Sequence, residues 1–134
     1  QHGQVGVVLV DLNDFKGVDE FDGQAAGDRQ LLDTASRLRA CVRACDTVAR
    51  LDDNDFVILL AELERPADAD QVAAKVLAAL DRPFGDSTPY TLLGTHVGIA
   101  IFPQDADDAD GLLTLADARA LRARQLGGPR IAHA

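Results

Sequence analysis

The sequence lacks long apolar runs and basic runs, and each absence excludes a class of protein. No apolar run approaches the roughly 20 residues that a helix needs to span a bilayer, so we expect this part of the protein to be soluble and to make no membrane contact. No lysine or arginine run is present, and the formal net charge is −9. Because an acidic surface repels nucleic acid, we expect no nucleic-acid partner.

Cysteine is scarce. Cys41 and Cys45 are the two cysteines of the sequence, and no histidine lies near them to complete a set of zinc ligands. We expect free thiols, which fit a reducing cytoplasm, and therefore a cytoplasmic location.

What is present is an ordinary globular composition, with 47% hydrophobic and 26% charged residues in 134. This length allows one sizeable core, and no internal repeat, linker or low-complexity segment divides the chain. We expect a single domain.

The spacing of apolar residues predicts the order strand, helix, strand, strand, helix, strand, helix and a last short strand. Strands are expected over 5–12, 46–51, 55–63, 95–102 and 130–134, where apolar and β-branched residues cluster. Long helices are expected over 25–44, 65–80 and 111–125, after a helical turn or two within 13–23. Two helical crossovers that bracket a hairpin define a ferredoxin-type α+β fold, a mixed sheet flanked by helices.

Acidic residues are expected to converge at one end of this sheet. Asp11 ends the first strand, and Asp52, Asp53 and Asp55 lie at the turn of the hairpin. Because the first three strands pair in the middle of the sheet, these two places lie side by side. Converging carboxylates are typical ligands of Mg²⁺ beside a nucleoside triphosphate, although acidic turns are also common on acidic proteins. Spacing alone leaves both interpretations open.

Three blocks resemble GGDEF domains, the diguanylate cyclases that join two GTP molecules into cyclic di-GMP. They are VDLNDFKGVDEFDGQAAGD at 10–28, DTVARLDDNDFVILL at 46–60 and ADARALRARQLGG at 116–128. The resemblance covers residues 5–131 and implies the GGDEF, or nucleotidyl-cyclase-like, version of the fold. It also implies that residues 1–134 are one such domain, taken from a longer multidomain bacterial protein and without the family's leading helix.

The signature of the family is degenerate in this sequence. Its five positions are occupied by Asp52, Asp53, Asn54, Asp55 and Phe56, so aspartate replaces both glycines. Glycine lets the backbone approach the nucleotide, whereas an aspartate side chain fills that space. One carboxylate about 5 Å from a phosphate oxygen costs on the order of 3 kcal/mol at an effective dielectric constant of about 20. Asn54 offers Mg²⁺ only a neutral oxygen, so the resemblance implies a domain without cyclase activity.

Four further positions are vestiges of the nucleotide site that the resemblance implies. Asp11 matches the first metal-binding Asp, Asp28 matches the guanine-edge Asp, and Arg124 stands at the phosphate-contacting Lys. Asp19 replaces an Asn, and an ionised carboxylate cannot donate that residue's hydrogen bond to guanine. We expect an unoccupied metal position and no cofactor, with Mg²⁺ present only if residual nucleotide binding persists.

The family's product-inhibition motif, R-x-x-D, is matched by Arg43 and Asp46, and Lys75 falls near the place of a third cation. In the family the Arg pairs with guanine and phosphate of cyclic di-GMP, and the Asp accepts guanine N–H groups. The alternative interpretation is a solvated Arg at a helix C-terminus, followed by an Asp that starts a strand.

The main hypothesis is therefore an inactive GGDEF domain that serves as a regulatory or interaction module in cyclic di-GMP signalling. Its expected partners are other domains of the same protein, an EAL phosphodiesterase or a sensor domain, or a separate signalling protein. One alternative is a cyclic di-GMP receptor that uses Arg43 and Asp46. Another is a weak cyclase, or a GTP-binding allosteric domain, that keeps Asp11 and Asp28.

Overall fold

The computed structural model describes residues 4–12, 32–51, 55–81, 95–126 and 131–132. The helical turn expected within 13–23 lies outside these residues. In chain order the elements are β1 (Gln4–Asp11), β2 (Thr47–Arg50), β3 (Asp55–Leu63), α2 (Ala67–Leu80), β4 (His96–Phe102), α3 (Ala109–Leu126) and β5 (Ile131–Ala132). Residues 32–40 form a further helix ahead of β2.

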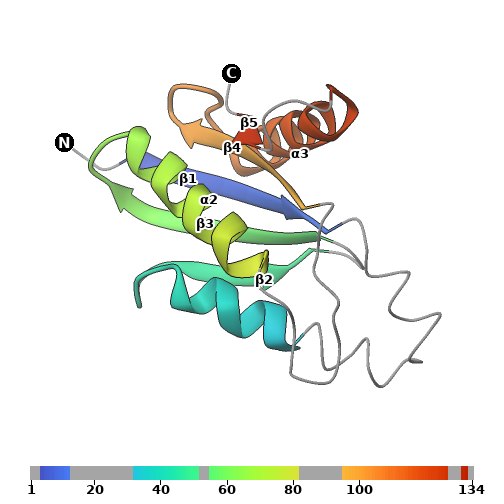
Figure 1. The fold of residues 1–134 in the computed structure, drawn as a ribbon. Helices are drawn as coiled ribbons and strands as arrows, with labels where there is room; N and C mark the ends of the chain where they lie inside the picture. The colour runs from blue at the N-terminus through green and yellow to red at the C-terminus, as the bar shows by residue number, and fades with distance from the viewer. Residues whose placement is uncertain (1–3, 13–31, 52–54, 82–94, 127–130, 133–134) are drawn as a thin grey trace, which may run out of the picture.

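The strands form one sheet in the order β2-β3-β1-β4-β5 (Figure 1). β1 is antiparallel to both of its neighbours, β3 and β4, and β5 is parallel to β4. This is the predicted ferredoxin-type arrangement with a short fifth strand added. β2 lies at the edge, which corrects the expectation that the first three strands share the middle. β1 and β4 are the more continuously apolar strands, so they take the places that are buried on both faces.

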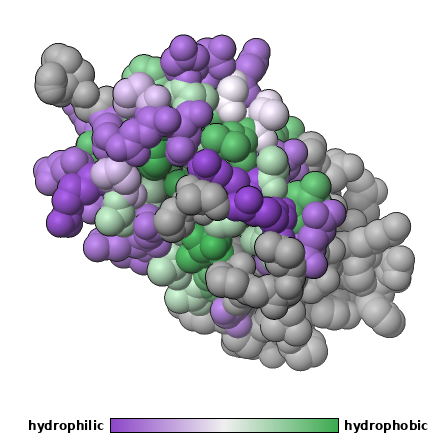
Figure 2. Space-filling model, turned by 90° about the horizontal axis from the view of Figure 1, so that it is seen from above, coloured by the Kyte–Doolittle hydropathy of each residue, from purple (hydrophilic) through white to green (hydrophobic). Residues whose placement is uncertain are grey.

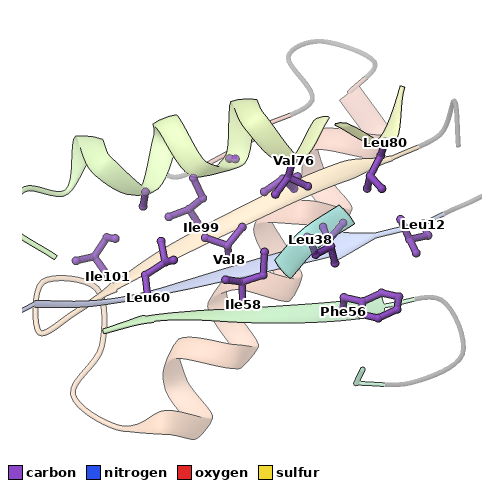
Figure 3. Close-up of a cluster of buried hydrophobic side chains, with 14 of the residues drawn as sticks. Val8, Leu12, Leu38, Phe56, Ile58, Leu60, Val76, Leu80, Ile99 and Ile101 are labelled. Atoms are coloured by element: carbon purple, nitrogen blue, oxygen red, sulfur yellow. The ribbon is translucent and has the colours of Figure 1, made fainter. Parts of the chain in front are cut away.

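The larger core lies on the face that α2 and the 32–40 helix cover. Figure 3 shows side chains of β1, β3 and β4 pointing toward α2, among them Val8, Ile58 and Ile99. Val76 and Leu80 of α2 and Leu38 of the 32–40 helix are fully buried against them. Leu38 recurs with Leu31, Ala35 and Val42 at helical spacing in the sequence, as Val76 and Leu80 do with Val72, and this spacing predicted the buried faces of the two helices.

On the opposite face, α3 packs closely on β4. The helix meets the sheet through small side chains, Ala116 and Ala120, and the strand presents Gly98 and Ala100 to it. A Cβ at Gly98 would overlap the carbonyl oxygen of Ala116 and lie 2.5 Å from the backbone nitrogen of Ala120. Glycine is therefore what allows this close approach.

The first long helix ends earlier than its apolar spacing predicted. The helical residues stop at Ala40 rather than Ala44, and the N–H of Cys41 bonds to the carbonyl of Leu38 in a tighter turn. The N–H of Arg43 donates to the carboxylate of Asp46 instead of continuing the helix. A side-chain acceptor has replaced a helical carbonyl, which is a common way for Asp to end regular structure.

The surface fits the acidic composition. Figure 2 shows hydrophilic residues over much of the described surface seen from above, with small hydrophobic patches between them. Among the described residues, no helix combines the length and apolar character that crossing a bilayer requires.

The close packing at Gly98 makes a stability prediction. Gly98→Ala is expected to lower the free energy of unfolding by about 3 kcal/mol, because the new methyl group meets helix backbone that cannot move aside on its own. Gly6→Ala is the matched control, since its Cβ would meet side chains and no backbone: the end of Leu63 at 2.9 Å, and Leu60 at an ordinary contact distance of 3.5 Å. Urea unfolding curves compare the two variants. Equal losses in both would contradict the packing described.

Candidate functional site

One end of the sheet brings together Asp11 and Asp55, two of the four acidic residues that the sequence placed there. Asp11, the last residue of β1, lies directly opposite Asp55 of β3 and His96 of β4. The signature residues Asp52, Asp53 and Asn54, and the vestigial positions Asp19 and Asp28, lie outside the described residues. Phe56 is 3% exposed and belongs to the core, so it anchors the hairpin beside the acidic pair.

Arg124 is directed at this acidic pair from the last turn of α3. Its guanidinium lies 3.3 Å from the carboxylate of Asp11, which is largely buried. The close seating of α3 on Gly98 brings the helix near enough for this contact. The resemblance assigned Asp11 to metal binding and Arg124 to phosphate contact. The structure joins these two residues in an ion pair.

Burial has the largest effect on Asp11 and raises the pKa of its carboxyl group. The charge of Arg124, a hydrogen bond with Asp55 and the charge of His96 lower the pKa, and Asp117 raises it further. The pKa remains above its ordinary value of 3.8, so the folded state disfavours the ionised form relative to water. Buried acids with shifted pKa values are frequent at functional sites.

Asp11 and Asp55 are the described carboxylates at this end that could hold Mg²⁺. Arg124 already neutralises Asp11, and burial already disfavours the charge that a metal ion needs. A metal ion there would have to displace the guanidinium. Among the described residues, the arrangement therefore fits a resident metal ion poorly.

A second cluster lies where the 32–40 helix turns into β2. Asp46 has a side chain only 2% exposed, and its carboxylate accepts hydrogen bonds from the Nε and terminal nitrogen of Arg43, at 3.2 and 3.1 Å. It also accepts the backbone N–H groups of Arg43 and Ala61, each at 3.0 Å. The other contact of the guanidinium is the carbonyl oxygen of Ala61 on β3. Arg43 and Asp46 thus tie the turn to the sheet.

The pKa of Asp46 shifts in the opposite direction to that of Asp11. Burial alone would raise it, but the side-chain and backbone hydrogen bonds from Arg43, the N–H of Ala61 and the charge of Arg43 together lower it. The difference in sign follows from the donors, because Asp46 accepts four N–H hydrogen bonds and Asp11 is held chiefly by one cation.

A pocket of about 190 Å³ joins the three residues that the R-x-x-D motif implied. Arg43, Asp46 and Lys75 all line it, together with the acidic residues Glu64 and Asp68. This volume is below the 300 Å³ or so at which ligand pockets usually begin, so it suits part of a ligand, such as one base or one phosphate.

The sequence did not reveal every neighbour of these residues. His96 and Asp117 act on Asp11, and Glu64 and Asp68 line the second pocket. The position of His96 follows from the register of β4 against β1, so a correct strand order could have found it. The proximity of Asp117 depends on how α3 sits on the sheet, which no local pattern encodes.

Comparison with known proteins agrees with this fold. The family model described as diguanylate cyclase, GGDEF domain, matches residues 1–130. The bifunctional diguanylate cyclase/cyclic di-GMP phosphodiesterase MucR of Pseudomonas aeruginosa is 37% identical over 90% of this chain and 18% of its own length. The diguanylate cyclase TpbB of the same species is 37% identical over 95% of this chain and 30% of its own.

Among solved structures, an EAL/GGDEF domain protein from M. capsulatus superimposes with a TM-score of 0.88 and 31% identity, covering 99% of this chain and 88% of that one. The chain belongs to the GGDEF domain family. It spans less than a third of the length of both curated relatives.

The raised pKa of Asp11 predicts a pH-dependent stability. A raised pKa means that Asp11 favours folding below its unfolded pKa and that this contribution is lost as pH rises through the folded pKa. Asp11→Asn keeps the shape and cannot ionise, so at pH 7 it is expected to have a higher free energy of unfolding than the parent, with the gain shrinking toward pH 3.8.

Urea unfolding at several pH values measures this difference, with Asp107→Asn, an exposed acid of the same charge, as the control. A variant less stable than the parent at pH 7 would show instead that the Arg124 ion pair outweighs burial.

Proposed function

We propose that this chain is a GGDEF domain without diguanylate cyclase activity, which acts as a regulatory or interaction module in cyclic di-GMP signalling. The observation that carries the proposal is the signature Asp52-Asp53-Asn54, which places two carboxylates and a neutral amide where the family has two glycines and a metal-binding acid. Phosphates of GTP would meet negative charge at this tip, with a weaker metal site to offset it.

The described part of the site supports the proposal. Arg124 is a cation that could contact a phosphate, and Asp11 is an acid that could bind a metal ion. Each is already engaged by the other in an ion pair. Nucleotide binding would have to break this ion pair. It would also leave an ionised Asp11 carboxylate buried without its cation, which costs free energy. Without a nucleotide, Arg124 therefore already has an anionic partner at this end of the sheet.

The relatives support the regulatory role rather than the loss of activity. TpbB is named a diguanylate cyclase, so overall similarity does not distinguish active from inactive domains. MucR is named for both cyclase and phosphodiesterase activity, and the M. capsulatus protein carries EAL and GGDEF domains. A GGDEF domain that has lost its own chemistry can still influence a neighbouring phosphodiesterase or sensor domain.

The enzymatic test is incubation with GTP and Mg²⁺, followed by chromatography. No cyclic di-GMP is expected, because two carboxylates at the hairpin tip repel the triphosphate. In titration with GTP, the double variant Asp52→Gly, Asp53→Gly is expected to bind on the order of a hundredfold more tightly than the parent.

The double variant Asp107→Asn, Asp108→Asn removes the same charge far along the chain from the hairpin and serves as the control. Cyclic di-GMP formed by the parent at a catalytic rate would overturn the proposal. It would favour the weak-cyclase hypothesis.

A second candidate function is a cyclic di-GMP receptor, and the shared pocket of Arg43, Asp46 and Lys75 is the observation in its favour. The carboxylate of Asp46 already accepts four N–H hydrogen bonds, so a ligand would meet mainly the two cations. The side chain of Arg43 is 54% exposed and Lys75 is exposed, so both are accessible to a phosphate.

Isothermal titration with cyclic di-GMP tests the receptor. If the site binds, Lys75→Ala is expected to weaken affinity roughly tenfold, since one charged contact is removed and the Arg43–Asp46 pair is left intact. Arg39→Ala, an exposed cation that does not line this pocket, is the control. Absence of heat from the parent would exclude the receptor, and so would equal weakening by both variants.

A further inference from the structure

The carboxylate of Asp46 has no acceptor position left for a ligand. Its Oδ1 accepts the N–H of Ala61 and a terminal nitrogen of Arg43, and its Oδ2 accepts the backbone N–H and the Nε of Arg43. An ionised carboxylate offers about four acceptor positions, so these four bonds fill it. The side chain is also only 2% exposed. Asp46 is therefore not placed to take the role that the resemblance gave it, which is to accept the N–H groups of guanine.

Two other carboxylates line the same pocket, and they differ in their partners. Asp68 is engaged by Arg65, since one of its oxygens accepts the backbone N–H of Arg65 at 3.3 Å and the other lies 3.4 Å from the guanidinium. Glu64 is the first residue after β3 and is exposed, and it has no hydrogen bond or ion pair within the described part of the chain. The oxygens of Glu64 are thus open to a ligand.

The rest of the pocket lining suits a flat base. Leu60 and Leu63 of β3 and Val72 of α2 give it apolar walls, and Figure 3 shows Leu60 on the α2 side of the sheet. Arg43 and Lys75 add two cations, which suit a phosphate or the acceptor edge of a base. A guanine nucleotide matches all of these groups. Its base has N–H donors at N1 and N2 on one edge and acceptors at O6 and N7 on another, and its phosphate is anionic.

We propose that Glu64, in place of Asp46, accepts the N1–H and N2–H groups of a guanine base in this pocket and so determines base specificity. The inference rests on the second candidate function, the cyclic di-GMP receptor, and names the group that would select its base. Asp46 then holds Arg43 in position, and Glu64 contacts the ligand. Adenine presents an acceptor at N1, which would face the lone pairs of the Glu64 carboxylate. A site built to accept N–H groups disfavours an analogue that lacks them.

The direction of the effect of removing the Glu64 charge separates recognition from simple electrostatics. A cyclic dinucleotide carries two phosphate charges, so an acid that merely lies near the pocket repels it, and removal of that acid tightens binding. An acid that accepts two N–H groups of the base contributes more than this repulsion costs at an exposed position, because hydrogen bonds to a charged group are the stronger ones. Removal of such an acid weakens binding.

Isothermal titration with cyclic di-GMP tests the inference on the parent, Glu64→Gln and Glu62→Gln. Glu64→Gln is expected to weaken binding roughly tenfold or more, because the amide replaces one acceptor by an NH₂ group that opposes the amino group of guanine. Glu62→Gln is the matched control, since Glu62 is an exposed acid whose charge also acts on Arg43 but which does not line the pocket. It is expected to bind as tightly as the parent, or slightly more tightly.

Titration with the adenine analogue, cyclic di-AMP, measures base specificity directly. The parent is expected to bind it roughly tenfold or more weakly than cyclic di-GMP. Glu64→Gln is expected to narrow this preference, because an amide can donate to N1 of adenine and accept from its N6 amino group.

Equal or tighter binding of cyclic di-GMP by Glu64→Gln would overturn the inference and leave the receptor function standing, and so would equal weakening by the two glutamate variants. A parent that gives no heat with cyclic di-GMP would remove the receptor function and the inference together. Neither result bears on the absence of cyclase activity, which turnover of GTP tests separately.

Discussion

The antiparallel register of β1 between β3 and β4 is the constraint on which the rest of the structure depends. Both faces of β1 are buried. A shift of its pairing register by one residue would move each apolar side chain to the opposite face of the sheet, where it would no longer fit its packing partners. The same register places Asp11 opposite Asp55 and His96 at the end of the sheet. The chemistry available at that end is thus fixed by core packing and not by the polar residues themselves.

Two buried aspartates illustrate how surroundings decide what a carboxylate does. Asp46 accepts four N–H hydrogen bonds and has a lowered pKa, so its charge holds the turn before β2 against β3. Asp11 has a raised pKa because burial outweighs the help of Arg124. The first charge strengthens the fold, whereas the second is kept at a cost to stability.

Much of the fold could be predicted from the sequence because its signals are local. The run at 55–63 predicted β3 with its observed bounds, and the spacing of Val72, Val76 and Leu80 predicted the buried face of α2. The predicted end of the first long helix was wrong by four residues. The hydrogen bond from the N–H of Arg43 to Asp46 depends on a turn that the spacing of apolar residues does not show. The edge position of β2 was missed as well, since a short strand gives little indication of its neighbours.

The candidate site could be predicted less completely. The convergence of Asp11 and Asp55 followed from topology, and the residues of the R-x-x-D motif do share one pocket. The ion pair of Arg124 with Asp11 could not be predicted, because it depends on how closely α3 approaches Gly98.

The central claim is that the carboxylates of Asp52 and Asp53, together with the pairing of Arg124 to Asp11, keep a triphosphate out of this end of the sheet. The most direct measurement is a crystal structure grown with Mg²⁺ and a non-hydrolysable GTP analogue. The account predicts that Arg124 still contacts Asp11 and that no ordered phosphate lies over the hairpin. A magnesium ion bound to Asp11, with the triphosphate ordered beside Asn54 and Arg124 turned toward it, would contradict the account.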